Sequence, residues 1–261
     1  MIEKIKSKDG TPIAYIKQGE GPALVLVHGS GVVANNWMTV LPALAEHFTV
    51  YAMERRGRGE SGDTEPYAIE REYEDIAALV DSIGQPVGLL GHSFGANLTL
   101  EASLLSPNIQ KLVLYEPALN LPHAQMIPSG LIDPIEELIN KGKKEEALSQ
   151  FYELIFIPDS EITLMKSLPD WAERAACAHT LPREIHVMER HVFDGEKFKN
   201  FLIKTMFMYG ENDQDDWGEV IKTLNQTLLD FSTDILPGQG HLAMMAAPDL
   251  FVEAVTRIFK D

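Results

Sequence analysis

The sequence predicts an α/β protein with a mostly parallel, eight-stranded twisted sheet, helices on both faces, and a helical cap inserted after the sixth strand. Short apolar runs alternate with segments of helical periodicity along most of the chain, the pattern of a parallel sheet with crossover helices. A length of 261 residues with 45% hydrophobic content is enough to bury one substantial core.

The predicted elements follow from the spacing of apolar residues. Residues 23–27 are a continuous apolar run, which is typical of a strand buried on both faces of a sheet. The predicted strands are residues 2–5, 13–16, 23–27, 48–53, 87–90, 111–115, 205–209 and 233–236. The predicted helices are residues 36–47, 67–83, 96–105, 217–228 and 248–259.

Residues 117–203 form a different kind of segment, with helical periodicity and no convincing strand. They are too many for an ordinary loop, so we expect a cap over the edge where the carboxyl ends of the strands meet. The expected core domain is then residues 1–116 and 204–261. Five large apolar residues of the cap are expected to pack in its interior: Met126, Phe156, Met165, Trp171 and Met188.

The amino-acid composition argues against several classes of binding partner. The net charge of −17 argues against nucleic acid or an anionic membrane, since both favour basic surfaces. Cys177 is the only cysteine, so no internal disulfide is possible and a reducing compartment is expected. No apolar run approaches membrane-spanning length, and the N-terminus lacks a signal-peptide pattern. We expect a cytoplasmic monomer or homodimer that acts on a small molecule.

The most informative motif is Gly91-His92-Ser93-Phe94-Gly95, a G-x-S-x-G sequence between a predicted strand and a predicted helix. In this context the serine sits on a sharp, strained turn with its hydroxyl exposed, and the two glycines let strand and helix approach. The motif therefore predicts a nucleophilic serine at the end of the strand.

Three further motifs follow predicted strands at the same edge of the sheet. They are His28-Gly29-Ser30-Gly31, Tyr209-Gly210-Glu211-Asn212-Asp213 and Gly238-Gln239-Gly240-His241. The chain order Ser93, Asp213, His241 is that of the α/β-hydrolase fold, and the chain resembles this superfamily over essentially its whole length. The resemblance includes the loop at residues 54–62, where many relatives begin with Asp and this chain has Glu54.

Each predicted catalytic group has a chemical reason. Ser93 is a poor nucleophile unless a base removes its proton, and the imidazole of His241 suits that role. A carboxylate must hold the other ring nitrogen and stabilise the imidazolium. Asp213 occupies the position that most α/β hydrolases use and is preferred, while Glu116, in Tyr115-Glu116-Pro117, is the alternative acid.

Backbone N–H groups of Ser30 and Phe94 are expected to form the oxyanion hole. His28 is expected to orient this loop, and His92 to point away from Ser93. Arg55 and Arg56 either bind an acidic substrate group or anchor their loop, and anchoring is preferred.

The sequence predicts a serine hydrolase of the carboxylesterase type, acting on an ester, thioester or lactone of small to medium, apolar character through an acyl-enzyme. Alternatives are a carbon–carbon bond hydrolase, a perhydrolase, or a non-catalytic ligand receptor. The carbon–carbon reaction is disfavoured because those relatives usually carry Trp after the catalytic His, where this chain has Leu242. Neither a dinucleotide motif nor a P-loop is present, and the His179, His186 and His191 spacing lacks a converging third ligand, so no cofactor or metal is expected.

Overall fold

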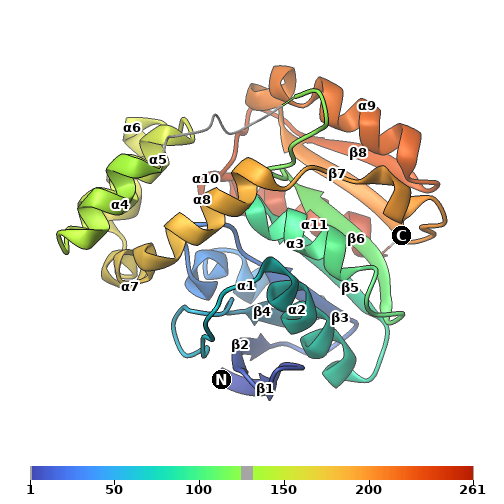
Figure 1. Cartoon of the computed structure of the whole chain (residues 1–261). Helices are drawn as coiled ribbons and strands as arrows, with labels where there is room; N and C mark the ends of the chain where they lie inside the picture. The colour runs from blue at the N-terminus through green and yellow to red at the C-terminus, as the bar shows by residue number, and fades with distance from the viewer. Residues whose placement is uncertain (1, 125–131, 261) are drawn as a thin grey trace.

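An eight-stranded sheet lies at the centre of the molecule, as predicted. The computed structural model describes residues 2–124 and 132–260, with the backbone alone at 214–216. The strands are β1 (Ile2–Lys6), β2 (Pro12–Gln18), β3 (Ala23–Val27), β4 (Thr49–Met53), β5 (Val87–His92), β6 (Ile109–Tyr115), β7 (Lys204–Gly210) and β8 (Phe231–Leu236). Their order is β1-β2-β4-β3-β5-β6-β7-β8, and β2 runs against both of its neighbours (Figure 1).

Burial along the strands follows their positions in the sheet. All residues of β3 and β4 are buried, because helices cover both faces of the central strands. β1 lies at the edge and alternates exposed and half-buried residues, which matches the predicted edge hairpin.

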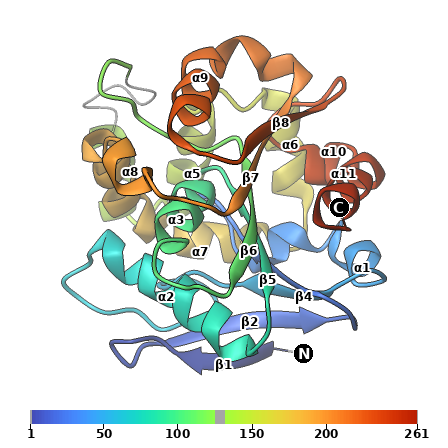
Figure 2. The same ribbon diagram turned by 90° about the vertical axis from the view of Figure 1, so that its right-hand side faces the viewer.

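Helices cover both faces of the sheet. They are α1 (Leu41–Leu44), α2 (Ile69–Ile83), α3 (Phe94–Ala102), α4 (Asp133–Asn140), α5 (Lys144–Leu154), α6 (Asp159–Ser167), α7 (Trp171–Ala176), α8 (Leu181–Arg190), α9 (Gly218–Thr227), α10 (Ala243–Ala246) and α11 (Pro248–Lys260). Short 3₁₀ helices are η1 (Ala34–Trp37), η2 (Cys177–Thr180), η3 (Gly195–Phe198) and η4 (Glu211–Asp216). Figure 2 shows α2, α3 and α9 on one face and α1 and α11 on the other.

The single helix predicted at residues 36–47 is wrong. The structure has two short pieces there, η1 and α1, joined at residues 38–40. Pro42 explains the break, because it has no N–H to donate to the preceding turn and is tolerated only in the first turn of a helix. It lies in the first turn of α1.

Residues 117–203, called the insert below, connect β6 to β7. Their described regular elements are the helices α4 to α8 with η2 and η3, besides two isolated bridges, Asn120 with Val192 and Leu121 with Ala124. In Figure 1 the helices α4 to α7 stand to one side of the sheet, and α8 leads back across it. Their buried apolar residues are continuous with the core beneath the sheet edge.

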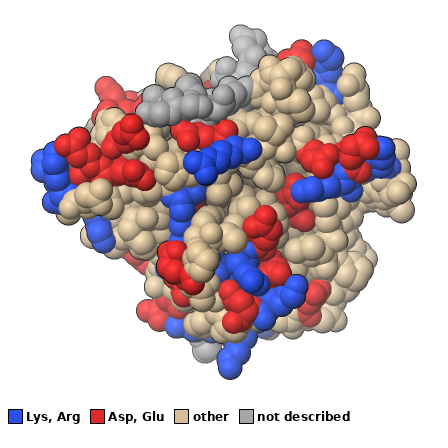
Figure 3. All heavy atoms as spheres, in the orientation of Figure 1, with Lys and Arg blue, Asp and Glu red and all other residues tan. Residues whose placement is uncertain are grey.

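The surface agrees with the acidic composition. On the face drawn in Figure 3, acidic and basic side chains are interspersed over the insert and the core alike. Within residues 2–124 and 132–260, the helices are all too short or too polar to span a bilayer.

Candidate active site

Ser93 occupies the sharp turn between β5 and α3. Its backbone has φ 55° and ψ −128°, a conformation that strains a residue with a side chain. Its N–H donates to the carbonyl of Tyr115 at 2.9 Å, which fixes the turn to the end of β6. A Cβ on Gly91 would collide with α3, and one on Gly95 with the backbone at the end of β3. The two glycines therefore permit the close packing that the motif predicted.

The loop after β3 lies directly beside Ser93. A Cβ on Gly29 would lie 2.9 Å from the Cβ of Ser93 and 3.4 Å from its hydroxyl oxygen. The next residue, Ser30, lines the same cavity as Ser93. Phe94 begins α3, so its N–H has no partner within the helix. Both predicted oxyanion donors thus belong to residues adjoining the serine.

His241 reaches the same cavity from the loop after β8. Its Nδ1 lies 2.6 Å from Oε2 of Glu116, a hydrogen bond that leaves Nε2 as the free ring nitrogen. The imidazole is 23% exposed and the Glu116 carboxylate 1% exposed. A buried acid thus holds a partly exposed base, as serine activation requires.

Glu116 is placed by the register of three strands. His92 of β5 pairs with Tyr115 of β6, so Ser93 and Glu116 follow at the same level of neighbouring strand ends. The Glu116 N–H donates to the carbonyl of Met208 at 3.1 Å, and its φ is 47°, another strained value. Its Oε1 accepts from the Gly210 N–H at 2.8 Å. Both carboxylate oxygens are therefore hydrogen-bonded.

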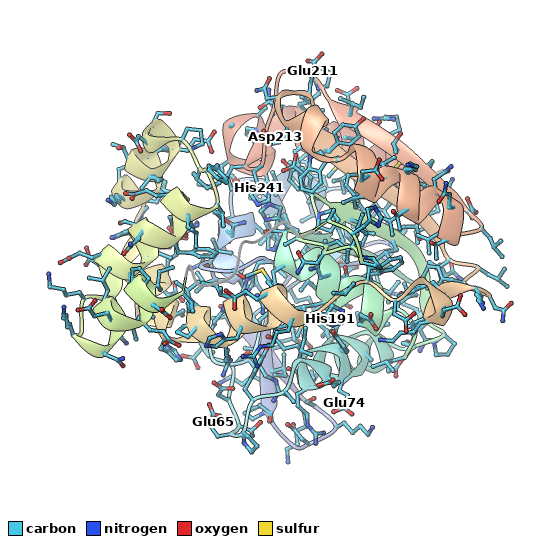
Figure 4. All side chains as sticks on the ribbon, turned by 45° about the horizontal axis from the view of Figure 1, so that its top comes forward. Glu65, Glu74, His191, Glu211, Asp213 and His241 are labelled. Atoms are coloured by element: carbon cyan, nitrogen blue, oxygen red, sulfur yellow. The ribbon has the colours of Figure 1, made fainter. Side chains whose placement is uncertain are left out.

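Asp213, the preferred acid of the sequence analysis, lies in η4 after β7 and lines the cavity. In Figure 4 it lies near His241, while Glu211 is at the periphery. A Cβ on Gly240 would lie 3.0 Å from Oδ2 of Asp213, so this carboxylate adjoins the residue before His241. The Nδ1 hydrogen bond of His241 is made with Glu116. The geometry thus favours the acid that the sequence ranked second.

The side chains of Tyr115 and His92 hold the His241 loop, a role that the sequence did not predict for either residue. The hydroxyl of Tyr115 donates to the Gly240 carbonyl at 2.5 Å and accepts from the Ala243 N–H at 3.1 Å. His92 Nε2 lies 2.9 Å from the His241 carbonyl, and burial lowers its pKa well below the usual value, so the ring is neutral and donates through Nε2. Through this hydrogen bond His92 supports the backbone of His241, and it lines a small cavity together with Ser93. The one sequence signal for the role of Tyr115 is its position directly before Glu116.

The loop after β4 is anchored by buried ion pairs. Arg55 pairs with Glu72 at 2.7 Å and donates to the Gly29 carbonyl at 2.9 Å. Arg56 pairs with Asp75 at 2.7 Å. The two arginines therefore anchor their loop, as preferred from the sequence, and both are fully buried.

His28 contacts the loop that contains Gly29. Its Nδ1 lies 2.9 Å from the Gly29 carbonyl, and its Nε2 accepts from the Arg55 N–H at 3.3 Å. Burial, with Arg58 and Arg55 nearby, lowers the pKa of His28 well below its usual value, so it stays neutral. Glu54, which stands where many relatives have Asp, also contacts the neighbouring loop. Its carboxylate accepts a hydrogen bond from the Ala34 N–H at 3.2 Å.

The insert contacts the Gly29–Gly31 loop and the arginine loop directly. The Tyr152 hydroxyl of α5 donates to the Gly31 carbonyl at 2.6 Å. Glu184 of α8 pairs with Arg55 at 3.0 Å and also with Arg58. No local sequence pattern marks Tyr152 or Glu184, because their partners are set by how the insert docks.

A cavity of about 890 Å³ opens over Ser93 and His241. Its lining combines apolar residues of the insert and the core with several carboxylates. The residues are Ser30, Ser93, Glu116, Ala118, Leu119, Leu121, Ala124, Phe151, Glu153, Leu154, Ile155, Phe156, Ile157, Pro158, Glu161, Met188, Asn212, Asp213, Trp217, Glu219, Val220, Gly240 and His241. Its size and mostly apolar walls suit a small to medium organic substrate.

The large apolar residues of the insert divide between its interior and this cavity. Trp171 is buried in the insert, whereas Met188 is buried and also lines the cavity. Phe156 contradicts the expectation of core packing, since it is 90% exposed at the cavity. It lies in the turn between α5 and α6 and has φ 60°. Met165 is buried in the core, as expected, and also lines a small adjoining cavity, whereas Met126 lies outside the described residues.

His179, His186 and His191 each have a different partner, and Nδ1 of His179 lies 3.1 Å from the Ala176 carbonyl oxygen. His186 is 3.3 Å from Glu136, and His191 is 3.5 Å from Glu101. In the described ranges no three His, Cys, Asp or Glu side chains converge as metal ligands would.

The sheet order and the strand–serine–helix turn define an α/β hydrolase. The family model described as the alpha/beta hydrolase family matches residues 24–254, so the chain belongs to that family. A crystal structure of an alpha/beta hydrolase from Sphaerobacter thermophilus superposes with a TM-score of 0.84 at 32% identity, covering 98% of this chain and 100% of that one.

Two further relatives match over nearly the whole chain. One is a pimeloyl-[acyl-carrier protein] methyl ester esterase from Nitrosospira multiformis, 26% identical over 92% of this chain and 95% of its own. The other is a 2-hydroxy-6-oxo-6-(2'-aminophenyl)hexa-2,4-dienoic acid hydrolase from Metapseudomonas resinovorans, 24% identical over 97% of this chain and 89% of its own. Similar proteins thus include a methyl ester esterase and a hydrolase named for a dienoic acid.

Proposed function

We propose that this protein is a serine hydrolase that cleaves a carboxylic ester or thioester through Ser93, His241 and Glu116. The observation that carries the proposal is the 2.6 Å hydrogen bond between His241 Nδ1 and a Glu116 carboxylate that is itself buried beside the serine turn. Glu116 takes the role of the acid in place of Asp213. The insert acts as a cap that shields the reaction from bulk water.

In the first half of the reaction, His241 Nε2 takes the Ser93 proton while the serine oxygen bonds to the substrate carbonyl carbon. The carbonyl π electrons move to its oxygen, where the N–H groups of Ser30 and Phe94 stabilise the charge. The carbonyl re-forms, the bond to the leaving oxygen or sulfur breaks, and that atom takes the proton from His241.

Water completes the cycle. His241 removes a proton from a water molecule as its oxygen attacks the acyl carbon, and collapse of the second tetrahedral intermediate returns the proton to Ser93. Glu116 stabilises the imidazolium in both halves without itself taking the proton. Of the groups used in these steps, Ser93, His241, Glu116 and Ser30 line one cavity.

Two observations favour the ester reaction over carbon–carbon bond cleavage. Leu242 follows the catalytic histidine where carbon–carbon hydrolases usually have Trp. The cavity walls are mostly apolar, which suits an uncharged acyl chain. Similarity to the esterase from Nitrosospira multiformis is consistent with this reaction and does not define the substrate.

The test compares the protein with its Ser93→Ala variant. A fluorophosphonate probe is expected to label Ser93 in the unaltered protein, which should also turn over short p-nitrophenyl esters. Ser93→Ala is expected to lose both. Ser82→Ala serves as the matched control, since Ser82 lies in α2 and donates to Leu79 far from the cavity. Labelling of Ser93 without turnover of any ester would favour a ligand receptor instead.

A further inference from the structure

Acidic side chains line the substrate cavity without Lys or Arg among the described lining residues. The five carboxylates that line it are those of Glu116, Glu153, Glu161, Asp213 and Glu219. The sequence of residues 125–131 has no charged residue, and that of 214–216 has no basic one. No positive side chain of those segments could therefore balance the cavity.

Four of these carboxylates differ in how their charges are satisfied. Glu116 pairs with His241, and Glu219 with Lys222 at 3.3 Å and His123 at 3.4 Å. Glu153 is exposed to solvent at the rim. Glu161, on α6, is half-buried, and no described side chain donates a hydrogen bond to it.

Glu161 also lies within electrostatic range of the catalytic centre. Burial raises the pKa of its carboxyl, and the positive charge of His241 acts in the opposite direction. Glu161 in turn contributes to raising the pKa of Tyr115, which lies under the His241 loop. Glu161 thus lines the cavity in which we propose that the substrate binds, and its partial burial weakens the screening of its charge by water.

We propose that Glu161 selects the charge of the substrate, so that the cavity prefers esters or thioesters carrying an ammonium group over those carrying a carboxylate. This inference rests on the proposed ester hydrolysis. A carboxylate in the substrate would meet Glu161 in a partly desolvated space, where like charges repel strongly. An ammonium group would pair with Glu161, to which no side chain in the described part of the chain donates, while the apolar walls hold the acyl chain.

Three thioesters of one acyl group test the proposal: butyrylthiocholine, its uncharged isostere S-(3,3-dimethylbutyl) thiobutyrate, and S-butyryl-3-mercaptopropionate. The ratio of kcat/KM for the cation to kcat/KM for the anion is expected to exceed about tenfold. Glu161→Gln should lower that ratio by about tenfold and change kcat/KM of the uncharged thioester by less than about threefold. Using a ratio removes any effect of the variant on His241 itself.

Glu153→Gln is the matched control, because it removes a rim carboxylate that water screens; it should change the ratio by less than about twofold. Raising the salt concentration from about 20 mM to about 500 mM should bring the cation-to-anion ratio of the unaltered protein closer to one. Equal kcat/KM for the cation and the anion, or an unchanged ratio in Glu161→Gln, would overturn the role of Glu161.

A binding measurement separates this inference from the proposed reaction. If no thioester is hydrolysed, the proposed function fails, and selectivity is measured with hexyltrimethylammonium and hexanoate by calorimetry. The unaltered protein should bind the cation about tenfold more tightly, and Glu161→Gln should lose that preference. Equal affinities of the two ligands for the unaltered protein would overturn the inference whether or not the protein is an enzyme.

Discussion

Glu116 uses both carboxylate oxygens to join the carboxyl ends of two strands to His241. Oε2 lies 2.6 Å from His241 Nδ1, and Oε1 accepts the N–H of Gly210, the last residue of β7, at 2.8 Å. The carboxylate is thus fixed in orientation before any substrate arrives. Such preorganisation lets it stabilise the imidazolium without rearrangement.

The first prediction concerns this acid. Glu116→Gln should lower kcat by about 10³- to 10⁴-fold, because the amide cannot stabilise the imidazolium and disfavours the required tautomer. Asp213→Asn should lower it by less than about tenfold. Both are measured as kcat for p-nitrophenyl butyrate under saturating conditions. A large loss of kcat for Asp213→Asn with a small loss for Glu116→Gln would show that Asp213 is the acid of the triad.

The second prediction concerns the support of the His241 loop. Tyr115→Phe removes a hydroxyl that bonds both Gly240 and Ala243, and leaves the Ala243 N–H without its partner. It should lower the free energy of unfolding by about 1–3 kcal/mol. Displacement of the imidazole should also lower kcat by about 10- to 100-fold. Urea denaturation and steady-state kinetics measure the two effects.

Tyr15→Phe is the control for that substitution. Its hydroxyl bonds Glu3 at 2.8 Å at the far edge of the sheet, so its loss should leave kcat unchanged. If Tyr115→Phe retained full kcat, the hydroxyl would have no part in positioning His241.

The third prediction concerns the contact between the insert and the arginine loop. Glu184 is fully buried and pairs with Arg55 and Arg58, which are buried as well. Glu184→Ala leaves positive charge buried without its partner and should cost about 3–5 kcal/mol of the free energy of unfolding. Glu146→Ala breaks the exposed pair with Lys143 and should cost less than about 0.5 kcal/mol. Equal costs, measured by urea denaturation, would contradict the buried network.

The fourth prediction concerns the pH dependence of stability. Burial raises the pKa of Glu54 from 4.5 to about 7, against the opposing effects of the Ala34 N–H and Arg58. Between these two values the folded protein holds more protons at this site than the unfolded chain. The contribution of Glu54 therefore lowers the free energy of unfolding as the pH rises through that window.

Glu54→Gln should flatten that decline when urea denaturation is compared at about pH 5 and about pH 8. Glu60→Gln, which alters an exposed side chain on the same loop, should follow the unaltered protein. An identical pH dependence in Glu54→Gln and the unaltered protein would show that this carboxyl titrates normally.

Local sequence patterns predict the fold and part of the candidate site. The apolar runs give the strands, and G-x-S-x-G between strand and helix places Ser93 at a strand end. The choice between Asp213 and Glu116 has no local signal, because both follow neighbouring strands. It depends on which loop carries a carboxylate to Nδ1 of His241, a distance set by the register of β5, β6 and β7.

Contacts made by the insert are harder still to predict from sequence. Tyr152 bonds the Gly31 carbonyl only because α5 docks over the loop after β3. Aromatic residues usually pack in the interior, yet Phe156 lies in a turn with φ 60° and is 90% exposed. Both features depend on tertiary packing and not on the periodicity of their own segments.

The central claim, that Ser93 forms an acyl-enzyme, is tested most directly by rapid quench with p-nitrophenyl butyrate, followed by intact-mass spectrometry and peptide mapping. We predict a butyryl adduct on the peptide containing Ser93 within the first turnover, with a matching burst of p-nitrophenol. The adduct should persist longer in Glu116→Gln and be absent in Ser93→Ala. An adduct on another residue, or turnover in Ser93→Ala at the unaltered rate, would contradict the account.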